Sequence, residues 1–149
     1  MILLAQRTEG ATLDIVADGV RTHVGRIAAG LVVYVGFEKI DADIDYAKYA
    51  EKMLNLRIFE DDAGKMNRSL RDISAGIMII PNFTLAADAS KGNRPSFDDA
   101  MPPIEARLCF ESFYNAVNTA HSMVVCGIFG ADMRITQHNN GPINMILRV

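Results

Sequence analysis

The stretch Gly76-Ile77-Met78-Ile79-Ile80-Pro81-Asn82-Phe83-Thr84-Leu85 decides the fold, because it joins a continuous apolar run to a short polar motif. An apolar run without alternating polar residues is typical of a strand that is covered on both faces. We therefore predict a buried strand over residues 77–85. The run at residues 30–37 has the same character and predicts a second buried strand at the centre of the sheet.

Further strands are expected on either side of these two runs. Residues 11–16 alternate apolar and polar side chains, and Asp18-Gly19 is a strong hairpin signal. Residues 20–27 then return as the partner strand of this hairpin. The remaining predicted strands cover residues 1–7, 123–129, 133–138 and 143–149.

Two helices separate these strands. Asp41 is placed to cap the first helix, which we expect to end near Leu56. Pro102-Pro103 open the second helix, which we expect to end near His121. The order of strands, helix, strands, helix and strands contains no repeat and no linker. It favours a single α+β domain over residues 1–149, with helices segregated from a large sheet or a pair of sheets.

The composition is that of an ordinary globular protein, since half of the 149 residues are hydrophobic and 22% are charged. No apolar run approaches the length that spans a bilayer, and Gln6 and Arg7 interrupt the N-terminal apolar stretch too early for a signal sequence. We therefore expect a cytoplasmic protein without membrane contact. Cys109 and Cys126 have apolar neighbours and are expected to be buried, reduced thiols. No Cys/His cluster has the spacing of a zinc site.

The net charge of −3 argues against a protein that coats nucleic acid without specificity. The basic residues nevertheless gather in two places. Lys91 and Arg94 lie in a loop that contains glycine and proline. A second cluster lies in residues 65–71, a segment that has no acidic residue. The members of that second cluster are Lys65, Arg68 and Arg71. A local basic surface and scattered solvated charge are both compatible with this pattern.

Familiar catalytic signatures are absent, because there is no nucleophile elbow, P-loop or dinucleotide fingerprint and the three histidines are scattered. Thr84 stands at the end of the predicted strand, where its hydroxyl and nearby backbone N–H groups can face a cleft. The alternative is an ordinary strand threonine on a half-buried surface. Asn82 has either a ligand-binding role or a role in the turn.

A second short motif, Asn139-Asn140-Gly141-Pro142-Ile143-Asn144, precedes the C-terminus. Glycine lets a ligand approach the backbone closely, and proline fixes the local φ and permits a cis peptide bond. A rigid turn of this kind, with exposed carbonyls, is suited to act as a steric gate. The alternative is an ordinary turn that joins the last two strands.

These two motifs together resemble the signature motifs of the D-aminoacyl-tRNA deacylases, enzymes that remove D-amino acids wrongly attached to tRNA. Other blocks resemble the family in the same order and at similar spacing, so the resemblance covers nearly the whole chain. These blocks are Gln6-Arg7, residues 55–59 with residues 64–67, residues 91–97, and residues 129–133.

The resemblance implies a three-layer β/β/α fold and a homodimer that acts on aminoacyl-tRNA carrying a D-amino acid or glycine. The reaction it implies is hydrolysis of the ester between the amino acid and the ribose of the terminal adenosine, for chiral proofreading in translation. The Gly141-Pro142 turn would enter the neighbouring subunit's pocket. Its carbonyls would capture the substrate amino group there and exclude an L side chain. Arg7 would help to hold that turn.

The same resemblance assigns roles to individual residues. Phe83 and Thr84 would be catalytic, and Lys91 and Arg94 would bind tRNA. The substrate-binding positions would be Asn82, Phe129, Met133, Gly141 and Pro142. No cofactor and no metal ion are implied.

Two departures from the family pattern lie within the motifs themselves. Pro81-Asn82 stands where the family usually has Ser-Gln, and Ile143-Asn144 stands where it usually has Val-Thr. A related deacylase branch, whose first motif opens with proline, has a trans Gly-Pro bond and tolerates certain L substrates. That branch lacks the phenylalanine that is present here as Phe83. Strict selection of D substrates and tolerance of some L substrates are therefore both open on the sequence.

Two mechanisms fit these residues. In one, the Thr84 hydroxyl attacks the ester, but no base is evident beside it and an unactivated hydroxyl is a weak nucleophile. In the other, water attacks with help from the tRNA's own 2′-OH, while backbone N–H groups near Phe83 and Thr84 polarise the carbonyl. We favour the second mechanism, in which Thr84 positions groups and does not attack.

Two other classes of function compete with this one. The main alternative is a catalytically inactive member of the fold that binds tRNA or another nucleic acid. The other is an unrelated hydrolase on a similar scaffold. Release of a D-amino acid from charged tRNA by the purified protein would separate the deacylase from both.

Overall fold

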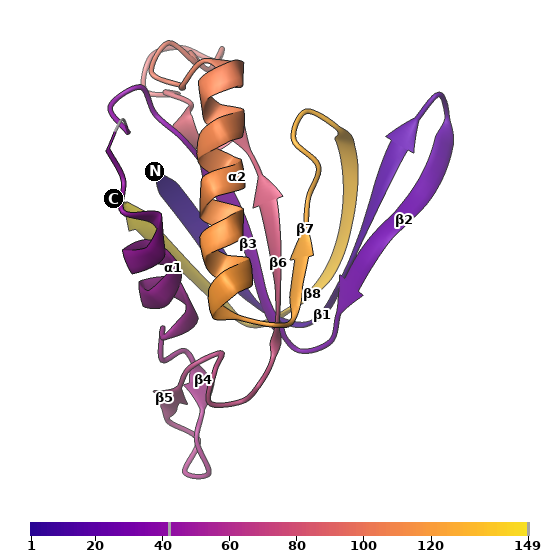
Figure 1. The fold of residues 1–149 in the computed structure, drawn as a ribbon, viewed down its shortest axis with the longest axis vertical. Helices are drawn as coiled ribbons and strands as arrows, with labels where there is room; N and C mark the ends of the chain where they lie inside the picture. The colour runs from indigo at the N-terminus through magenta and orange to yellow at the C-terminus, as the bar shows by residue number, and fades with distance from the viewer. Residues whose placement is uncertain (42, 149) are drawn as a thin grey trace.

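The computed structural model describes residues 1–41 and 43–148 and shows strands with two helices (Figure 1). The strands are β1 (Ile2–Ala17), β2 (Val20–Ile27), β3 (Gly30–Gly36), β4 (Phe59–Glu60), β5 (Met66–Arg68), β6 (Gly76–Pro81), β7 (Val124–Cys126) and β8 (Asp132–Arg148). The helices are α1 (Tyr46–Leu54) and α2 (Pro103–Ala120), and a short 3₁₀ helix, η1, covers Phe83–Ala86. The predicted α+β class is confirmed.

The hairpin at Asp18-Gly19 is confirmed, and it joins β2 to a longer β1 than we predicted. Both turn residues have positive φ, 51° for Asp18 and 75° for Gly19, as a two-residue hairpin turn requires. The strands predicted separately at residues 1–7 and 11–16 form one continuous strand. Its first half pairs with β3 and its second half with β2, so β1 links the two parts of the sheet.

The C-terminal strands are also merged, and the prediction of two strands joined by a turn is wrong. β8 runs through residues 132–148 beside β1, with Gly141 and Pro142 inside it (Figure 1). Gln6 pairs with Asn144, whereas Thr8 pairs with Asn139, so residues 140–143 have Arg7 alone opposite them. The extra residues bulge from the strand because the continuous β1 holds the ladder on both sides. Val149, the last residue of the predicted strand, lies outside the described residues.

The central strand predicted at residues 30–37 is confirmed as β3, which pairs in parallel with β6. The strand predicted over residues 77–85 is shorter, because β6 ends at Pro81 and the chain turns into η1. β7 is also shorter than residues 123–129. A proline has no N–H to extend the ladder, so β7 stops pairing where it would pass Pro81.

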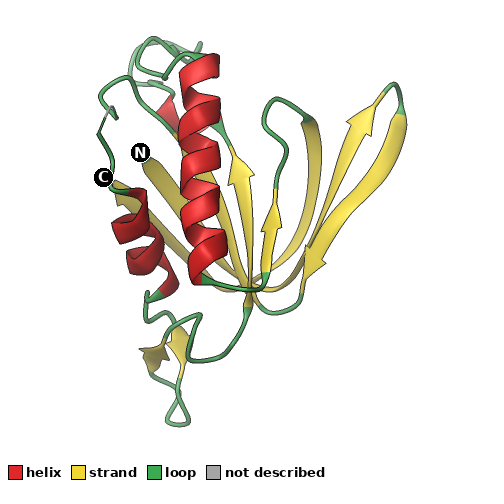
Figure 2. Ribbon diagram, in the orientation of Figure 1, coloured by secondary structure: helices red, strands yellow, loops and turns green. Residues whose placement is uncertain are grey.

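Two apolar clusters on opposite faces of the central strands define three layers. One cluster lies between the sheet and the helices, and both helices lie on the same side of the sheet (Figure 2). The other lies between the central strands and the bent-over half that β1, β2 and β8 form. The buried residues of this second cluster are Ala11, Leu13, Ile27, Val32, Met78 and Ile80. The expected β/β/α layering is confirmed.

The first helix begins later than predicted, and Asp41 does not cap it. Asp45 is the cap, and its carboxylate accepts a hydrogen bond from the Lys48 N–H at 3.0 Å. The Asp41 carboxylate instead pairs with the buried amino group of Met1 and accepts from the Glu38 N–H at 2.6 Å. A buried ammonium requires a charged partner, and this requirement outweighs the capping role. Within residues 1–41 and 43–148, neither helix is long and apolar enough to cross a membrane.

Candidate active site

The Thr84 motif forms a self-capped turn directly after β6. The Asn82 side-chain oxygen accepts hydrogen bonds from the Thr84 N–H at 3.1 Å and from the Thr84 hydroxyl at 2.6 Å. The Asn82 N–H donates to the Val35 carbonyl at 2.8 Å, which ties the turn to β3. An amide oxygen does not take up a proton at neutral pH. The hydroxyl of Thr84 therefore donates to a group that does not act as a general base.

One backbone donor of this turn is left free. The Thr84 N–H is used by Asn82, whereas the Phe83 N–H makes no hydrogen bond to the described residues. Such an N–H, at the first position of a helical turn, is available to an oxygen of a ligand. Sequence reasoning predicted donors near both residues, and the geometry leaves the one on Phe83 available.

The Phe83 ring lies at the surface and contacts the basic loop. The side chain is 60% exposed, and its ring centroid is 5.1 Å from that of Phe97. Phe97 ends the loop that carries Lys91 and Arg94, so this aromatic pair holds the loop beside the turn. Lys91 and Arg94 are exposed, and neither forms an ion pair within residues 1–41 and 43–148.

A cavity of about 90 Å³ lies beside the turn. It brings Asn82, Phe83 and Phe129 together, although Phe129 is more than forty residues away in sequence. The other lining residues are Val35, Gly36, Phe37, Pro81, Met101, Ala106 and Gly130. Met133 is not among them, since it packs against the second apolar cluster on the other face of the sheet.

Gly36 positions this turn, and our sequence reasoning gave it no role. A Cβ on Gly36 would stand 2.9 Å from the Asn82 carbonyl oxygen and 2.9 Å from the Leu85 Cβ. The close packing of the turn over β3 therefore requires the absence of a side chain. The available signal was a glycine that directly precedes Phe37 at the end of a buried strand.

Gly141 and Pro142 form the bulge in β8, and their peptide bond is cis. Gly141 has a φ of +114°, and a Cβ added there would stand 2.8 Å from the Ile143 Cγ1 and 3.4 Å from Arg7 Nη2. The buried Arg7, only 6% exposed, lies under the bulge. Its Nε donates to the Asn140 carbonyl at 3.4 Å.

Arg7 is itself held by the segment that contains β4. Its Nη1 donates to the Ile58 carbonyl at 2.9 Å, and its Nη2 lies 3.6 Å from the Glu60 carboxylate. The block at residues 55–59 therefore has a structural role, because its Ile58 carbonyl helps to fix the guanidinium beneath the bulge. Ile58 and Glu60 were not predicted, since the carbonyl and the carboxylate come from about fifty residues away in sequence.

A chain of side-chain amides crosses the other side of the bulge. Gln6 Nε2 donates to Asn144 Oδ1 at 2.7 Å. Gln137 Nε2 donates to Gln6 Oε1 at 2.7 Å and to Asn139 Oδ1 at 2.7 Å. The Gln137 Oε1 is buried and has no hydrogen-bond partner among the described residues. Residues 139 and 144, which flank the bulge, are thus connected through Gln137 and Gln6. We refer to these four residues as the amide chain.

The two motifs lie at opposite ends of the central strands. The Thr84 turn packs over Gly36, whereas Arg7, under the bulge, pairs with Leu31. Leu31 and Gly36 are five residue steps apart along β3, which corresponds to roughly 17 Å. A single chain therefore keeps the Gly141-Pro142 bulge away from its own Thr84 turn.

Two of the three cations in the second basic cluster are paired with acids, which favours scattered charge over a local basic surface there. Arg68 pairs with Asp62 at 2.7 Å, and Arg71 pairs with Glu51 at 2.7 Å. The acids come from the β4–β5 turn and from α1, which sequence spacing did not place beside the arginines. Lys65 is exposed.

His23 and His121 lie away from both motifs, whereas His138 directly precedes Asn139 of the second motif. His23 Nδ1 is 2.9 Å from the Asp14 carboxylate, and His121 Nε2 is 2.8 Å from the Ala75 carbonyl. Both cysteines are free and half-buried, and burial raises the pKa of the Cys126 thiol to about 11. Within residues 1–41 and 43–148, no three His, Cys, Asp or Glu side chains are grouped to hold a metal ion.

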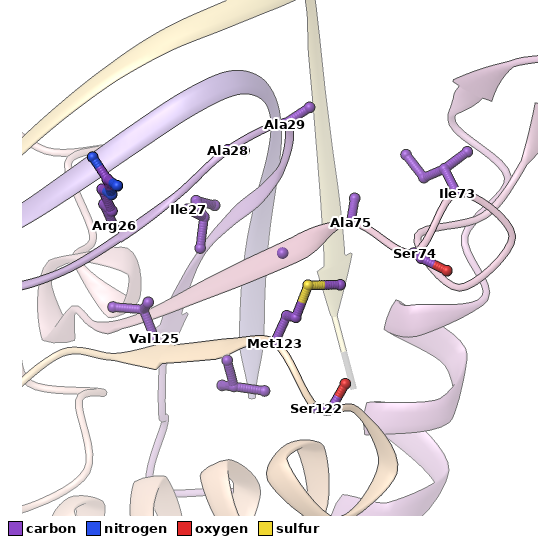
Figure 3. Close-up of a pocket in the computed structure, with 12 residues that line it drawn as sticks. Arg26, Ile27, Ala28, Ala29, Ile73, Ser74, Ala75, Ser122, Met123 and Val125 are labelled. Atoms are coloured by element: carbon purple, nitrogen blue, oxygen red, sulfur yellow. The ribbon is translucent and has the colours of Figure 1, made fainter.

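A larger hollow, of about 500 Å³, lies at the opposite end of β6 from the Thr84 turn (Figure 3). Its lining is mostly apolar and includes Ile27, Met123 and Val125, with Arg26 as its charged member. None of the predicted site residues lines it. We therefore place the candidate active site at the smaller cavity, where the free Phe83 N–H meets two further predicted residues, Asn82 and Phe129.

Comparison with known proteins agrees with this architecture. Residues 4–148 match the family described as D-Tyr-tRNA(Tyr) deacylase. The D-aminoacyl-tRNA deacylase of Variovorax paradoxus is 44% identical over 149 residues, covering 100% of this chain and 99% of that protein. The D-aminoacyl-tRNA deacylase of Dichelobacter nodosus is 43% identical, with 100% of both chains covered.

Two solved structures are also similar. One, described as c-Myc DNA Unwinding Element Binding Protein, has a TM-score of 0.89 at 30% identity and covers 100% of this chain and 99% of its own. The other, a probable eukaryotic D-amino acid tRNA deacylase, has a TM-score of 0.84 at 18% identity, with 98% and 97% covered, and shares the fold. From the match over residues 4–148 and the full-length relatives, this chain belongs to the D-Tyr-tRNA(Tyr) deacylase family.

Proposed function

We propose that this protein hydrolyses the ester bond of D-aminoacyl-tRNA and releases the free D-amino acid and tRNA. The observation that carries the proposal is the free Phe83 N–H, which adjoins the cavity shared by Asn82 and Phe129 in a chain of this family. The names of the relatives from Variovorax paradoxus and Dichelobacter nodosus support the same activity. Chiral proofreading in translation, in the cytoplasm, is the role that this activity would serve.

The reaction we propose uses water and the substrate's own ribose. Water attacks the ester carbonyl carbon, and the Phe83 N–H donates to the oxygen as negative charge develops on it. The proton of the attacking water passes, with help from the neighbouring ribose hydroxyl, to the ribose oxygen that leaves. The products are a free carboxylic acid and a free ribose hydroxyl, so water is the only co-reactant.

Thr84 has a positioning role in this mechanism. Its hydroxyl donates to Asn82 Oδ1, and a nucleophilic hydroxyl would instead need a base that accepts its proton. The same Asn82 oxygen holds the Thr84 N–H, so the side chain of Asn82 fixes the turn that presents the Phe83 N–H. Phe83 therefore supplies the catalytic donor, and Asn82 and Thr84 hold it in place.

Discrimination against L substrates is assigned to the Gly141-Pro142 bulge of a second copy of the chain. The separation of roughly 17 Å along β3 supports this arrangement, because a chain's own bulge is remote from its own turn. Backbone carbonyls of Gly141 and Pro142 would accept hydrogen bonds from the substrate ammonium. An L side chain would then point into the bulge and be excluded. Phe129 would complete the substrate pocket, whereas Met133, on the other face of the sheet, would not contact the substrate there.

The activity is tested by single-turnover hydrolysis of matched D- and L-aminoacyl-tRNA with the purified protein. We expect fast release from the D ester and slow release from the L ester. Tight binding of tRNA without release from either ester would instead establish an inactive binding protein. Equal rates on both esters would confirm the hydrolase and reject the proposed chirality.

The two-subunit site is tested by mixing two defective chains. One carries Gly141→Ala, and the other carries Asn82→Ala with Thr84→Ala. In a hybrid dimer, one site receives an intact turn and an intact bulge, whereas the second site receives both defects. Mixed chains should therefore regain activity that neither parent has. No recovery in hybrids that light scattering shows to be dimers would place both motifs of one site on the same chain.

The tRNA-binding loop is tested through salt dependence. Replacing Lys91 and Arg94 by alanine removes two exposed cations, and each lost phosphate contact should reduce the slope of log affinity against log salt by about one. Arg68→Ala is the matched control, because its guanidinium is already paired with Asp62. A loop variant with the wild-type slope would place the tRNA elsewhere on the protein.

A further inference from the structure

A cation outside the predicted site stands beside the candidate cavity. The Arg107 guanidinium on α2 lies over the Phe129 ring, 5.0 Å from its centroid. The guanidinium also lies near Gly130, the residue after Phe129, because a Cβ added to Gly130 would stand 3.9 Å from Arg107 Nη2. Phe129 and Gly130 both line the cavity that contains Asn82 and Phe83.

Helix geometry places the charge at the rim of that cavity. Ala106, the residue before Arg107, is buried and is part of the cavity lining. Arg107 itself is exposed, so the helix turns its side chain outward over the edge that Ala106 covers. The guanidinium is therefore in contact with solvent and with the cavity's aromatic wall at the same time.

The guanidinium of Arg107 is oriented but electrostatically unpaired. It forms no ion pair and no hydrogen bond within residues 1–41 and 43–148, unlike Arg68 and Arg71. Stacking on a ring engages the face of the guanidinium and leaves its N–H donors, which lie in the plane, free to point outward. Five such donors in a planar fork match the oxygens of a phosphate.

We propose that Arg107 binds the 5′ phosphate of the nucleotide whose ribose carries the aminoacyl ester. This inference rests on the proposed function, because it takes the ester carbonyl to lie at the Phe83 N–H. The nearest phosphate to that ester belongs to the same ribose, and Arg107 is the cation at the cavity wall nearest Phe129. Lys91 and Arg94 do not line the cavity and belong to the loop that Phe97 ends, so they are left to contact other phosphates.

The test compares two small substrates that differ by one phosphate. These are the D-aminoacyl ester of adenosine and the same ester of adenosine 5′-phosphate. We expect wild-type kcat/KM to be about tenfold higher for the phosphorylated ester, as one charge-assisted contact gives. Arg107→Gln should lose that preference through KM while hydrolysing the adenosine ester at the wild-type rate. Arg107→Lys, which keeps the charge without the planar fork, should retain part of it.

Arg26→Gln is the matched control, because Arg26 is also exposed but lines the hollow at the opposite end of β6. The control should keep the full preference for the phosphorylated ester. A wild-type enzyme without this preference, or an Arg107→Gln variant that retains it, would overturn the proposal. So would an equal loss on both esters, which would indicate a role in shaping the cavity and not in binding phosphate.

A second measurement covers the full substrate. With D-aminoacyl-tRNA, Arg107→Gln should reduce the salt slope of kcat/KM by about one and leave kcat at saturation unchanged. If wild-type protein releases no amino acid from any ester, the proposed function fails. The salt slope of tRNA binding then still decides whether Arg107 contacts a phosphate, because an unchanged slope would reject it.

Discussion

The Thr84 turn and the Gly141-Pro142 bulge contrast in how they are held. The turn is stabilised from within, because Asn82 caps Thr84 two residues later. The bulge is stabilised from outside, by Arg7 on one side and by the amide chain on the other. Apart from its hydrogen bond to Val35 and its close packing over Gly36, the self-capped turn depends on its own residues. A bulge held by long-range contacts is sensitive to several parts of the chain at once.

The contrast extends to the chemistry that each motif presents. The turn offers a backbone donor, the Phe83 N–H, whereas the bulge offers carbonyl acceptors in a backbone that needs a positive φ at Gly141. A donor suits the ester oxygen, and acceptors suit the ammonium group of the same substrate. The two motifs are therefore complementary, and changes to each should affect different kinetic quantities.

The largest effect is expected from Gly141→Ala. The new Cβ would stand 2.8 Å from the Ile143 Cγ1, at a φ of +114° that L side chains rarely adopt. A local backbone shift of about 1 Å near the substrate is enough to reduce the rate about 100-fold. We expect single-turnover hydrolysis of D-aminoacyl-tRNA to fall by about this factor.

Gly64→Ala is a control that separates the effect of backbone strain from the effect of blocking the gate. Gly64 also has a positive φ, +73°, but a Cβ there would have nothing within 4 Å. This control should lose a small amount of thermal stability and keep full activity. If Gly141→Ala kept normal rates on D esters and normal discrimination against L esters, the bulge would not form the gate.

A smaller effect is expected from Thr84→Ala. The variant loses one neutral hydrogen bond to Asn82, which corresponds to about 1 kcal/mol and a rate reduction of roughly fivefold. A nucleophile would cost far more, on the order of 10⁶-fold by analogy with catalytic serines. Thr84→Ser keeps the hydroxyl and should keep most of the activity. A covalent ester on Thr84, found by mass spectrometry after rapid quenching, would contradict the positioning role.

The turn was easier to predict from the sequence than the bulge, because the turn is held mostly by neighbouring residues and the bulge by distant ones. Asn82 and Thr84 are neighbours, so a polar motif after an apolar run predicts a local structure. The supports of the bulge come from positions such as Glu60 and Gln137, whose contacts depend on how β4 and β1 fold back. Sequence reasoning identified Arg7 through the family resemblance, but spacing alone gives no distance between residues 7 and 140.

The features that differ from the sequence analysis have one physical origin, since each involves a charge partner from another part of the fold. Asp41 has the sequence signature of a helix cap, yet the buried Met1 ammonium takes its carboxylate. Arg68 and Arg71 are a run without acids in sequence, yet each meets an acid from another element. Local signals predict local structure well. Charge partners are decided by tertiary contacts, and sequence spacing does not show which residues those contacts bring together.

A modest effect is expected when the amide chain is cut by Gln137→Leu. The change removes the bonds to Gln6 and Asn139, but it also removes a buried carbonyl oxygen that has no partner among the described residues. An unpaired buried acceptor costs about 1–3 kcal/mol, so the net change in stability should be small. Discrimination between D and L esters should fall severalfold while the melting temperature stays nearly constant.

Gln137→Glu is the informative companion to this variant. It keeps the shape of the side chain but replaces the donor amide by acceptors, which face the Gln6 and Asn139 oxygens. It should therefore disturb the bulge more than leucine does. Unchanged discrimination in both variants, measured by single-turnover kinetics, would show that Arg7 alone holds the bulge.

The smallest effect on activity is expected at the end of the β1–β2 hairpin around Asp14 and His23, which contacts neither motif and serves as a reference region. There, His23 first and Arg21 second lower the pKa of Asp14, since both donate hydrogen bonds to its carboxylate. A carboxyl whose pKa is lower in the folded state than in the unfolded state stabilises the fold above its unfolded pKa of about 3.9. That contribution is lost as the pH falls through the lower, folded value.

Asp14→Asn should therefore reduce the melting temperature near neutral pH and reduce the further loss that acid causes. Below the folded pKa of Asp14, the two proteins should converge, because the wild-type carboxyl is then protonated as well. Thermal unfolding of both proteins across the acid range measures this difference. Hydrolysis of D-aminoacyl-tRNA at neutral pH should be unchanged, since this end of the hairpin contacts neither the turn nor the bulge. A loss of activity in this variant that exceeds its loss of stability would show that the reference region is coupled to one of the two motifs.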